Sequence, residues 1–195
     1  MGLGDAHAPG ATPLDPDEAS GLIPKHIRTQ QELNEWEQDN ILNASRWALR
    51  ARPTDVLTEA FVRNLHRRMF DRTWKWAGDF RRSDKNIGVN WLRIGVELHV
   101  LLDDTRYWLD NGTYPLDEVA ARFHHRLVSI HPFANGNGRH SRLIADVLLT
   151  RYGGMPFTWG SSDLVAPGNA RTRYIASLRA ADGGDYSALL AFVKS

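Results

Sequence analysis

Apolar residues recur every three or four positions along most of the chain, a spacing that predicts amphipathic helices. The clearest example is the stretch 116–130, where Val119, Phe123, Leu127 and Ile130 form one apolar stripe. The pattern as a whole predicts a mainly α-helical fold, with helices at about residues 29–52, 54–70, 97–108, 116–130, 138–152, 168–181 and 185–193.

Residues 80–94 are the least helical part of the chain, and we refer to them as the flap. Ile87, Val89 and Trp91 alternate there with glycine and asparagine, which favours a short β-hairpin or an extended surface loop. A plain connection between two helices is the alternative, although fifteen residues are many for one in a compact domain.

Residues 1–20 lack any periodicity and are rich in Gly, Ala, Pro and Asp, so we expect a flexible N-terminal arm. Residues 21–195 are expected to form a single domain. Residues 1–40 carry a net charge of −6, whereas the rest of the chain carries +7. The acidic arm is either a solubilising tail or a segment that docks near a basic site and competes with anions there.

The composition excludes several kinds of protein. There are no cysteines, hence no disulfides and no thiolate zinc site. No apolar run reaches the length of a membrane helix, and the N-terminus has neither the basic start nor the apolar core of a signal peptide. We therefore expect a cytoplasmic protein that does not bind membranes. No basic stripe interleaved with aromatic residues is present, so direct nucleic-acid binding is not expected.

Candidate chemistry is concentrated in the stretch His131-Pro-Phe-Ala-Asn-Gly-Asn-Gly-Arg-His-Ser-Arg142. A neutral histidine such as His131 can take a proton near pH 7. The run Gly136-Asn137-Gly138 can adopt positive φ angles, so that successive backbone N–H groups converge on an anion. Arg139 and Arg142 lie three residues apart at the start of a predicted helix, whose positive end adds to their charge. Together these groups predict a site that holds a polyphosphate and activates a hydroxyl beside it.

Other candidate residues have ordinary structural interpretations. Three further histidines flank the central stretch, but no spacing of carboxylates supports a metal site, so we interpret them as satisfied polar residues: His124, His125 and His140. Trp74 and Trp76 could stack on a nucleotide base, yet aromatic pairs before a glycine more often belong to the core.

The central stretch resembles the signature of the Fic family, which reads His-x-Phe-x-(Asp/Glu)-Gly-Asn-Gly-Arg-x-x-Arg. The chain matches it at His131, Phe133, Gly136, Asn137, Gly138, Arg139 and Arg142. The segment 76–79 also resembles the one that precedes the family's flap. The resemblance implies a Fic-type helical bundle with a small β-hairpin flap. Segments 21–24 and 32–37 further resemble the subgroup called mobile mystery protein B, which is typically encoded beside a small helix-turn-helix partner.

The resemblance also implies an activity, namely transfer of AMP from ATP to a Ser, Thr or Tyr hydroxyl of a target protein. His131 would be the general base, and Phe133 would anchor the loop in the core. The glycine-rich run 136–138 would bind the α- and β-phosphates, Arg139 the β-phosphate and Arg142 the γ-phosphate. In the flap, Ile87, Gly88 and Val89 would pair with an extended segment of the target. A toxin-like role and a small antitoxin or helix-turn-helix partner are part of the same expectation.

Asn135 departs from the family pattern, which has a carboxylate at this position that helps to hold Mg²⁺. Asparagine offers only a neutral oxygen, so we expect weaker metal binding at Asn135. One alternative is therefore a nucleotide-binding module with little or no transferase activity. Another is transfer of a different phosphate-linked group, such as UMP or phosphocholine.

Many members of the family are inhibited by a helix whose glutamate pairs with the second arginine of the signature. No strict match to its (Ser/Thr)-x-x-x-Glu-(Gly/Asn) pattern occurs in this chain. The candidate inhibitory residue is Glu37, which lies in an acidic predicted helix. The alternative, which we prefer, is that Glu37 is an ordinary solvent-exposed residue on the face of that helix.

Overall fold

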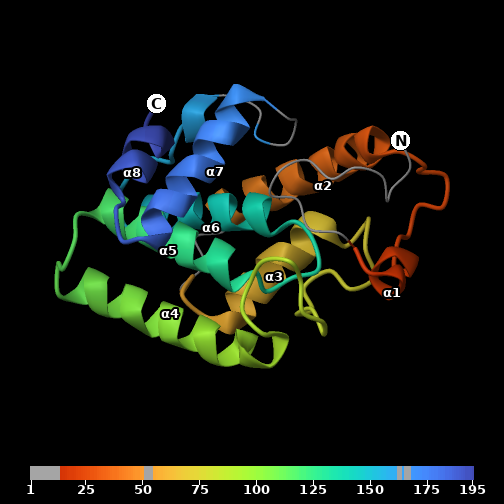
Figure 1. Ribbon diagram of the computed structural model, residues 1–195, viewed down its shortest axis with the longest axis horizontal. Coiled ribbons are helices and arrows are strands. Elements are labelled where there is room, and N and C mark those ends of the chain that lie inside the picture. The colour runs from red at the N-terminus through yellow and green to blue at the C-terminus, as the bar shows by residue number, and fades with distance from the viewer. Residues whose placement is uncertain (1–13, 51–54, 162–163, 165–167) are drawn as a thin grey trace.

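The computed structural model describes residues 14–50, 55–161, 164 and 168–195 (Figure 1). These residues are mainly helical, as predicted. The α-helices are α1 (Pro16–Ser20), α2 (Gln30–Arg50), α3 (Glu59–Phe70), α4 (Ile94–Asp110), α5 (Leu116–Ile130), α6 (Asn137–Arg151), α7 (Asn169–Asp182) and α8 (Ser187–Val193), with short 3₁₀ helices η1 (Trp91–Arg93) and η2 (Trp159–Ser161).

Helices α5 and α6 form the centre of the molecule, and the other long helices pack around them (Figure 1). Helix α4 lies against α5, α3 against α6, and α2 against both α3 and α6. Helices α7 and α8 pack on each other, and α8 also contacts α5. The main core is apolar and draws on every one of α2 to α6; its largest members include Leu33, Leu65, Phe70, Leu101, Phe123 and Leu127. The loop between α5 and α6 is therefore held at both ends by buried helices.

The predicted helix boundaries agree best where the signals are local. Helix α5 spans the predicted residues 116–130. Helix α3 starts later than predicted, because the Thr58 side chain accepts a hydrogen bond from the Phe61 N–H and caps the helix there. Helix α4 starts at Ile94 rather than at residue 97, directly after η1.

The predicted β-hairpin of the flap is not confirmed. Residues 80–90 form an irregular loop, and no residue of the described flap is in a β-strand. The Asp84 carboxylate accepts hydrogen bonds from the Asn90 amide group (2.9 Å) and the Trp91 N–H (2.8 Å), so a side chain closes the end of the loop instead of a strand ladder.

The N-terminal arm differs from the prediction in its second half. Residues 1–13 lie outside the described residues, whereas 16–20 form the helix α1 rather than a flexible segment. The Glu18 carboxylate accepts a hydrogen bond from the Asp15 N–H at the start of this helix. After it, Leu22 forms an isolated antiparallel bridge with Trp74, which ties the start of the domain to the segment after α3.

Trp74 is buried in the core, as expected, and stacks on the partly buried Trp76.

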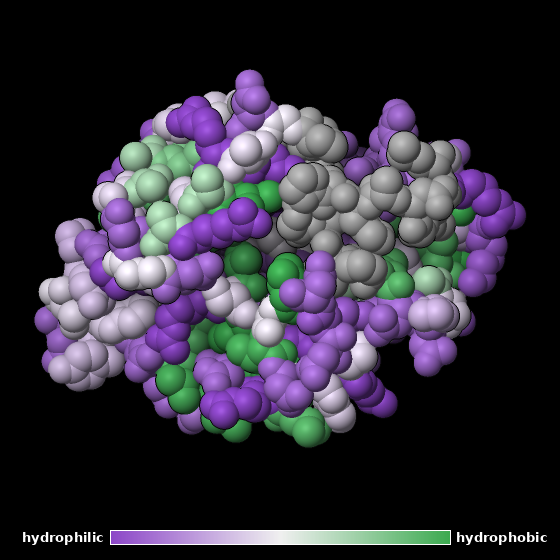
Figure 2. Space-filling view, viewed as in Figure 1, coloured by the Kyte–Doolittle hydropathy of each residue, from purple (hydrophilic) through white to green (hydrophobic). Residues whose placement is uncertain are grey.

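On the face seen in Figure 2, most side chains are hydrophilic and the apolar ones form small, separate areas. Among the described helices, none combines the length and the apolar character that crossing a membrane requires.

Candidate active site

The site begins where α5 ends. His131 follows the helix with φ 55° and ψ 59°, the left-handed conformation that non-glycine residues adopt at a cost of about 1–3 kcal/mol. Its N–H still donates to the Leu127 carbonyl (3.2 Å), so the chain turns sharply at His131 without losing the last helical bond. Pro132 then prevents the helix from continuing.

The His131 side chain is largely buried, with 6% of the residue exposed. Burial lowers its pKa to about 4, and the positive charges of Arg81 and Lys85 act in the same direction. A hydrogen bond with the backbone of Val128 acts the other way. The imidazole is therefore neutral at pH 7, which is the form that can accept a proton.

The loop after His131 is closed by a side chain from α6. The Asn137 amide accepts a hydrogen bond from the Phe133 N–H (2.9 Å) and donates one to the Phe133 carbonyl (2.7 Å). The Phe133 ring is fully buried, as the resemblance implied. Residues 133–137 thus form a small closed ring, which fixes the N-terminus of α6 relative to His131.

His66, which the sequence analysis did not identify, packs against this loop and is hydrogen-bonded to it. Its Nδ1 accepts a hydrogen bond from the Gly78 N–H and its Nε2 bonds to the Asn135 carbonyl, both at 3.0 Å. The His66 ring also stacks on Phe133, with centroids 3.7 Å apart. Burial holds the pKa of His66 well below its usual value, so the ring stays neutral. The available signal was its place on the apolar face of α3, four residues after Val62.

Gly136 allows the turn into α6. Its φ is 79°, and a Cβ there would lie 2.5 Å from the Phe70 ring, so both conformation and space require glycine. The first N–H groups of α6, those of Asn137, Gly138 and Arg139, have no preceding helical turn to accept them. They give the helix end the partial positive charge that binds phosphates.

Both predicted arginines lie beside this helix end. A Cβ on Gly138 would be 3.6 Å from an Nη of Arg142, so that guanidinium folds back toward the first turn of α6. The Arg142 guanidinium also lies 5.6 Å from the centre of the Tyr174 ring on α7. We call Gly136–Arg142 the phosphate cradle.

Arg139 has a partner from another helix. Its guanidinium donates to the Glu37 carboxylate at 2.6 Å, and the Trp74 indole N–H donates to the same carboxylate at 2.7 Å. Glu37 is only 1% exposed, so the preferred interpretation of a solvent-exposed residue was wrong. It contacts the first arginine of the signature, Arg139, and not Arg142 as the family pattern would have it.

Asn135 lies at the entrance of the cradle, and its side-chain oxygen accepts a hydrogen bond from the Gly136 N–H. One predicted phosphate-binding N–H is thus engaged by Asn135, the side chain at which only weak metal binding was expected. Among the described residues, no three His, Cys, Asp or Glu side chains are grouped as metal ligands. The donors beside the cradle therefore do not fit an ion held by the protein, because Mg²⁺ is usually bound through carboxylates plus substrate phosphates.

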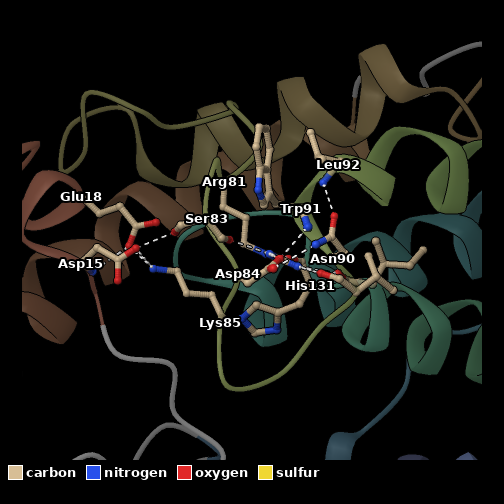
Figure 3. A network of polar contacts seen from close by, with 12 residues as sticks. Asp15, Glu18, Arg81, Ser83, Asp84, Lys85, Asn90, Trp91, Leu92 and His131 are labelled. Carbon is tan, nitrogen blue, oxygen red and sulfur yellow. Dashed lines mark hydrogen bonds and ion pairs between the residues drawn. The ribbon is translucent and has the colours of Figure 1, made fainter.

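The flap passes directly over His131 (Figure 3). A Cβ on Gly88 would lie 2.7 Å from the Cβ of His131, and the Val89 N–H donates to the Ile130 carbonyl at 3.3 Å. Ile87, next to Gly88, is 38% exposed. Of the three predicted flap residues, the structure thus brings Gly88 against His131, bonds Val89 to the preceding residue, Ile130, and leaves Ile87 partly exposed.

Helix α1 reaches the flap through a second set of contacts, which we call the clasp: Asp15, Glu18, Ser83 and Lys85 (Figure 3). The Lys85 ammonium lies 2.7 Å from the Asp15 carboxylate and 2.5 Å from that of Glu18, and the Ser83 hydroxyl donates to Asp15 at 2.5 Å. Two acidic residues of the arm, Asp15 and Glu18, therefore contact the flap, and competition of the arm with anions stays a prediction.

Arg81 is the other residue that the sequence did not single out. Its guanidinium is buried and donates to the His131 carbonyl at 2.7 Å. No local pattern marks this position, because two of its four side-chain acceptors, the Ile130 and His131 carbonyls, lie about fifty residues away along the chain.

The three flanking histidines each make a ring hydrogen bond, but the prediction that they are satisfied holds only in part, because the buried Nδ1 of His140 has no hydrogen-bond partner among the described residues. His124 bonds to the Tyr174 hydroxyl (2.9 Å), His125 to Asp182 (2.8 Å) and His140 to the Val62 carbonyl (3.0 Å).

Comparisons with known proteins point in one direction. Residues 56–149 match the Fic/DOC family. Protein adenylyltransferase Fic of Drosophila mojavensis is 32% identical over 137 residues, which are 68% of this chain and 26% of that protein. The same enzyme of Aedes aegypti is 31% identical over 144 residues, 71% of this chain and 27% of that protein. The chain thus spans about a quarter of the length of these relatives.

Solved structures show the same fold. Fic-1 of C. elegans (residues 134–508) is 26% identical, with a TM-score of 0.61 over 91% of this chain and 51% of that one. BepC of Bartonella tribocorum, whose structure contains bound AMPPNP, has a TM-score of 0.72 over 92% of this chain and 97% of its own, at 16% identity. At that identity the second match supports the fold alone.

Proposed function

Because the chain belongs to the Fic/DOC family, we propose that it is a protein adenylyltransferase that moves AMP from ATP to a hydroxyl side chain of another protein. The observation that carries this proposal is the position of a neutral, buried histidine, His131, five residues before the phosphate cradle begins and in contact with the flap. The relatives that share about a third of the residues are named for this activity.

The cradle would bind the triphosphate of ATP. The N–H groups at the start of α6 offer hydrogen bonds and a positive helix end, and Arg139 and Arg142 add two full charges. We assign the α- and β-phosphates to the backbone of residues 136–138, the β-phosphate also to Arg139, and the γ-phosphate to Arg142. To bind phosphate, the Gly136 N–H must exchange the Asn135 side-chain oxygen for a phosphate oxygen.

The transfer step uses one proton acceptor of the chain. The His131 imidazole takes the proton of the target hydroxyl, and the oxygen forms a bond to the α-phosphorus of ATP. The bond between the α-phosphorus and the bridging oxygen breaks, and pyrophosphate leaves with the electron pair. A base of this kind contributes about 10²–10⁴-fold to the rate.

The target would reach the base along the flap. Gly88 lies against His131 and Val89 is bonded to Ile130, so a peptide that pairs with the backbone of the flap would bring its hydroxyl side chain to the imidazole. The described flap contains no strand, so this pairing would have to order the loop as the target binds.

Asn135 favours a second candidate function, a nucleotide-binding module without transfer. The side chain carries no charge, and its oxygen is engaged by the Gly136 N–H. We derive no step through a metal ion; Mg²⁺ would have to be brought by the ATP phosphates themselves. An Asn135→Asp variant distinguishes the two functions: increased transfer in that variant, over a basal rate that is already measurable, supports an enzyme of reduced rate. Transfer that appears only in the variant supports the module.

Glu37 would restrain the cradle. Its bond to Arg139 competes with any bond from that guanidinium to a phosphate. A Glu37→Gly variant should therefore bind ATP more tightly, and unchanged affinity would remove the idea. A toxin-like role, an antitoxin or helix-turn-helix partner and a cytoplasmic location stay predictions from the sequence.

The position of the label in ATP tests the proposed function. The purified protein is incubated with cell lysate, Mg²⁺ and ATP labelled at either the α- or the γ-phosphate. Transfer of AMP labels protein bands from α-labelled ATP and leaves them unlabelled from γ-labelled ATP. Labelling from γ-labelled ATP would indicate phosphate transfer, and competition by UTP or CDP-choline would indicate another phosphate-linked group. Either result would overturn the proposal, as would the absence of any label.

A further inference from the structure

Arg81 forms an unusual set of contacts for a buried cation. It is 3% exposed, and its guanidinium donates to backbone carbonyls from three segments of the chain (Figure 3). Nε donates to the His131 carbonyl (2.7 Å), Nη1 to the Ser83 carbonyl (2.7 Å), and Nη2 to the carbonyls of Val89 and Ile130. Two of these acceptors belong to the flap and two to the turn that contains the base.

The charge of Arg81 is balanced mainly by the backbone. The nearest carboxylate, that of Asp84, lies 3.8 Å away and is largely exposed. The carbonyls of Ile130 and His131 lie at the C-terminal end of α5, where the last carbonyls have no helical partner and carry partial negative charge. The planar guanidinium is suited to this arrangement because it presents five N–H donors in fixed directions, whereas an ammonium group offers three on a single atom.

The backbone bonds of the same region show what Arg81 holds together. The Arg81 N–H donates to the Pro132 carbonyl (2.9 Å) and the Val89 N–H to the Ile130 carbonyl (3.3 Å), so both ends of the flap loop are bonded to residues 130–132. The guanidinium fills the space between them. A Cβ on Gly88 would lie 2.8 Å from its Nη2, and the φ of Gly88 is 104°, so the flap backbone follows the Arg81 side chain closely.

We propose that Arg81 is a positioning residue for the transfer reaction: it fixes the left-handed turn at His131 and the flap segment 86–89 in one arrangement, so that a target lying on the flap meets the imidazole. The inference rests on the proposed transferase function and assigns a role to a residue outside the signature. Arg81 itself acts through the backbone of His131 and does not need to touch ATP or the hydroxyl.

The charge of Arg81 supports the same role. After burial, it is the largest cause of the low pKa of His131, and Lys85 of the flap adds to it. Asp15 and Glu18 of α1 face Lys85 and form ion pairs with it, while Asp84 of the flap faces Arg81. Loss of Arg81 should therefore raise the pKa of His131 toward its ordinary value of about 6.5.

Two substitutions separate the geometry from the charge. Arg81→Met removes the hydrogen-bond donors and the charge and keeps a long side chain. Arg81→Lys keeps the charge but loses the planar set of guanidinium N–H donors. Arg82→Ala is the matched control, because Arg82 is the neighbouring residue and is exposed. Four quantities are measured on the full chain: amide hydrogen exchange of Val89, titration of the His131 imidazole by NMR, ATP affinity, and transfer from α-labelled ATP.

The expected results differ for each variant. Hydrogen bonds to charged groups contribute about 1.5–3 kcal/mol, so the Val89 amide should exchange at least about tenfold faster in both Arg81 variants and at the wild-type rate in Arg82→Ala. The midpoint of the His131 titration should rise in Arg81→Met and stay unchanged in Arg81→Lys. ATP affinity should stay within about twofold, whereas transfer from labelled ATP should fall at least about tenfold.

Wild-type exchange of Val89 in a folded Arg81→Lys protein would overturn the proposal, as would a loss of ATP affinity equal to the loss of transfer. If Arg81→Met does not fold, the Arg81→Lys result decides alone. The exchange and titration measurements do not depend on activity. Failure of the proposed function would therefore appear separately: the wild-type protein would transfer nothing, while the Val89 amide would still exchange faster in the Arg81 variants than in the wild type.

Discussion

The two sides of the candidate site are built in different ways. The phosphate cradle consists of consecutive residues that are braced by buried neutral groups: the amide of Asn137, the rings of His66 and Phe133, and the close approach of Gly136 to Phe70. The flap is held by charged side chains, with Arg81 beneath it and the clasp of Asp15, Glu18, Ser83 and Lys85 at its edge. The cradle is thus a fixed backbone frame in which the Gly136 N–H and the Arg139 guanidinium already have partners within the chain, whereas the flap is held mainly by charged side chains.

Lowering the pH should have the largest effect on the free energy of unfolding, and it should act through the buried histidines rather than through the clasp. The pKa values of His131 and His140 are lowered to about 4 by burial, and that of His124 to about 3. Below pH 6.5 the unfolded chain binds more protons than the folded one at these positions. The free energy of unfolding should therefore fall as the pH falls from 6.5 to 4, by about 2 kcal/mol per histidine at pH 5.

The clasp should not weaken over the same range. The hydrogen bond from Lys85, followed by that from Ser83, lowers the pKa of Asp15, so the carboxylate is charged at pH 5 and above. Urea unfolding from pH 7.5 to 5 measures the effect. A His140→Gln variant should reduce the slope with pH, and His99→Gln, whose ring is exposed, should leave it unchanged. A free energy of unfolding that does not vary with pH would contradict the neutral state of the buried histidines.

Arg139→Ala should destabilise the cradle side by about 3–5 kcal/mol, because it leaves the buried Glu37 carboxylate without its cation. The double variant Arg139→Ala with Glu37→Gln should recover most of the loss, since the uncompensated charge is gone. Thermal unfolding of the single and double variants measures the difference. Equal melting temperatures for the wild type and Arg139→Ala would show that the pair is exposed to solvent.

Gly136→Ala should cost less, about 1–2 kcal/mol for the left-handed φ and about 1–3 kcal/mol for the contact with Phe70. Gly138→Ala is the matched control, because a Cβ there meets Arg142 at an ordinary 3.6 Å and its φ is not positive. The melting temperature should therefore fall only for Gly136→Ala. A comparable fall for both would mean that the turn into α6 does not depend on Gly136.

Lys85→Met should have the smallest effect on stability, about 1–2 kcal/mol, between an exposed and a buried ion pair, because the side chains of Lys85 and Glu18 are largely buried while that of Asp15 is half-exposed. Its effect should be local: faster hydrogen exchange in residues 83–90 and unchanged ATP affinity. Lys75→Met, at an exposed position, is the control. A change in ATP affinity in Lys85→Met would show that the clasp and the cradle are not independent.

The cradle could be predicted because its groups are consecutive in the sequence. His131, Gly136 and the two arginines are brought together by one turn and the start of one helix, so spacing alone determines their arrangement. The seven predicted helices followed from apolar periodicity in the same way, and only their ends moved, as with the Thr58 cap of α3.

The contacts made by distant residues could not be predicted. His66 is bonded to Asn135 across a separation that no local pattern encodes, and Glu37 was a candidate only through the family resemblance, which pointed to Arg142 rather than Arg139. The flap was expected to pair as a hairpin from its alternation, but Asp84 and Arg81 satisfy its backbone with side chains instead. The short helix α1 was overlooked because five residues carry too little periodicity to be recognised.

The most direct test of the account is a His131→Ala variant assayed in parallel for ATP affinity and for transfer from α-labelled ATP. The imidazole is assigned to the hydroxyl and the cradle to the phosphates, so affinity should stay within about twofold while transfer falls by about 10²-fold or more. Transfer at the wild-type rate would contradict the assignment of His131 as the base. A loss of ATP affinity as large as the loss of transfer would contradict the separation of base and cradle.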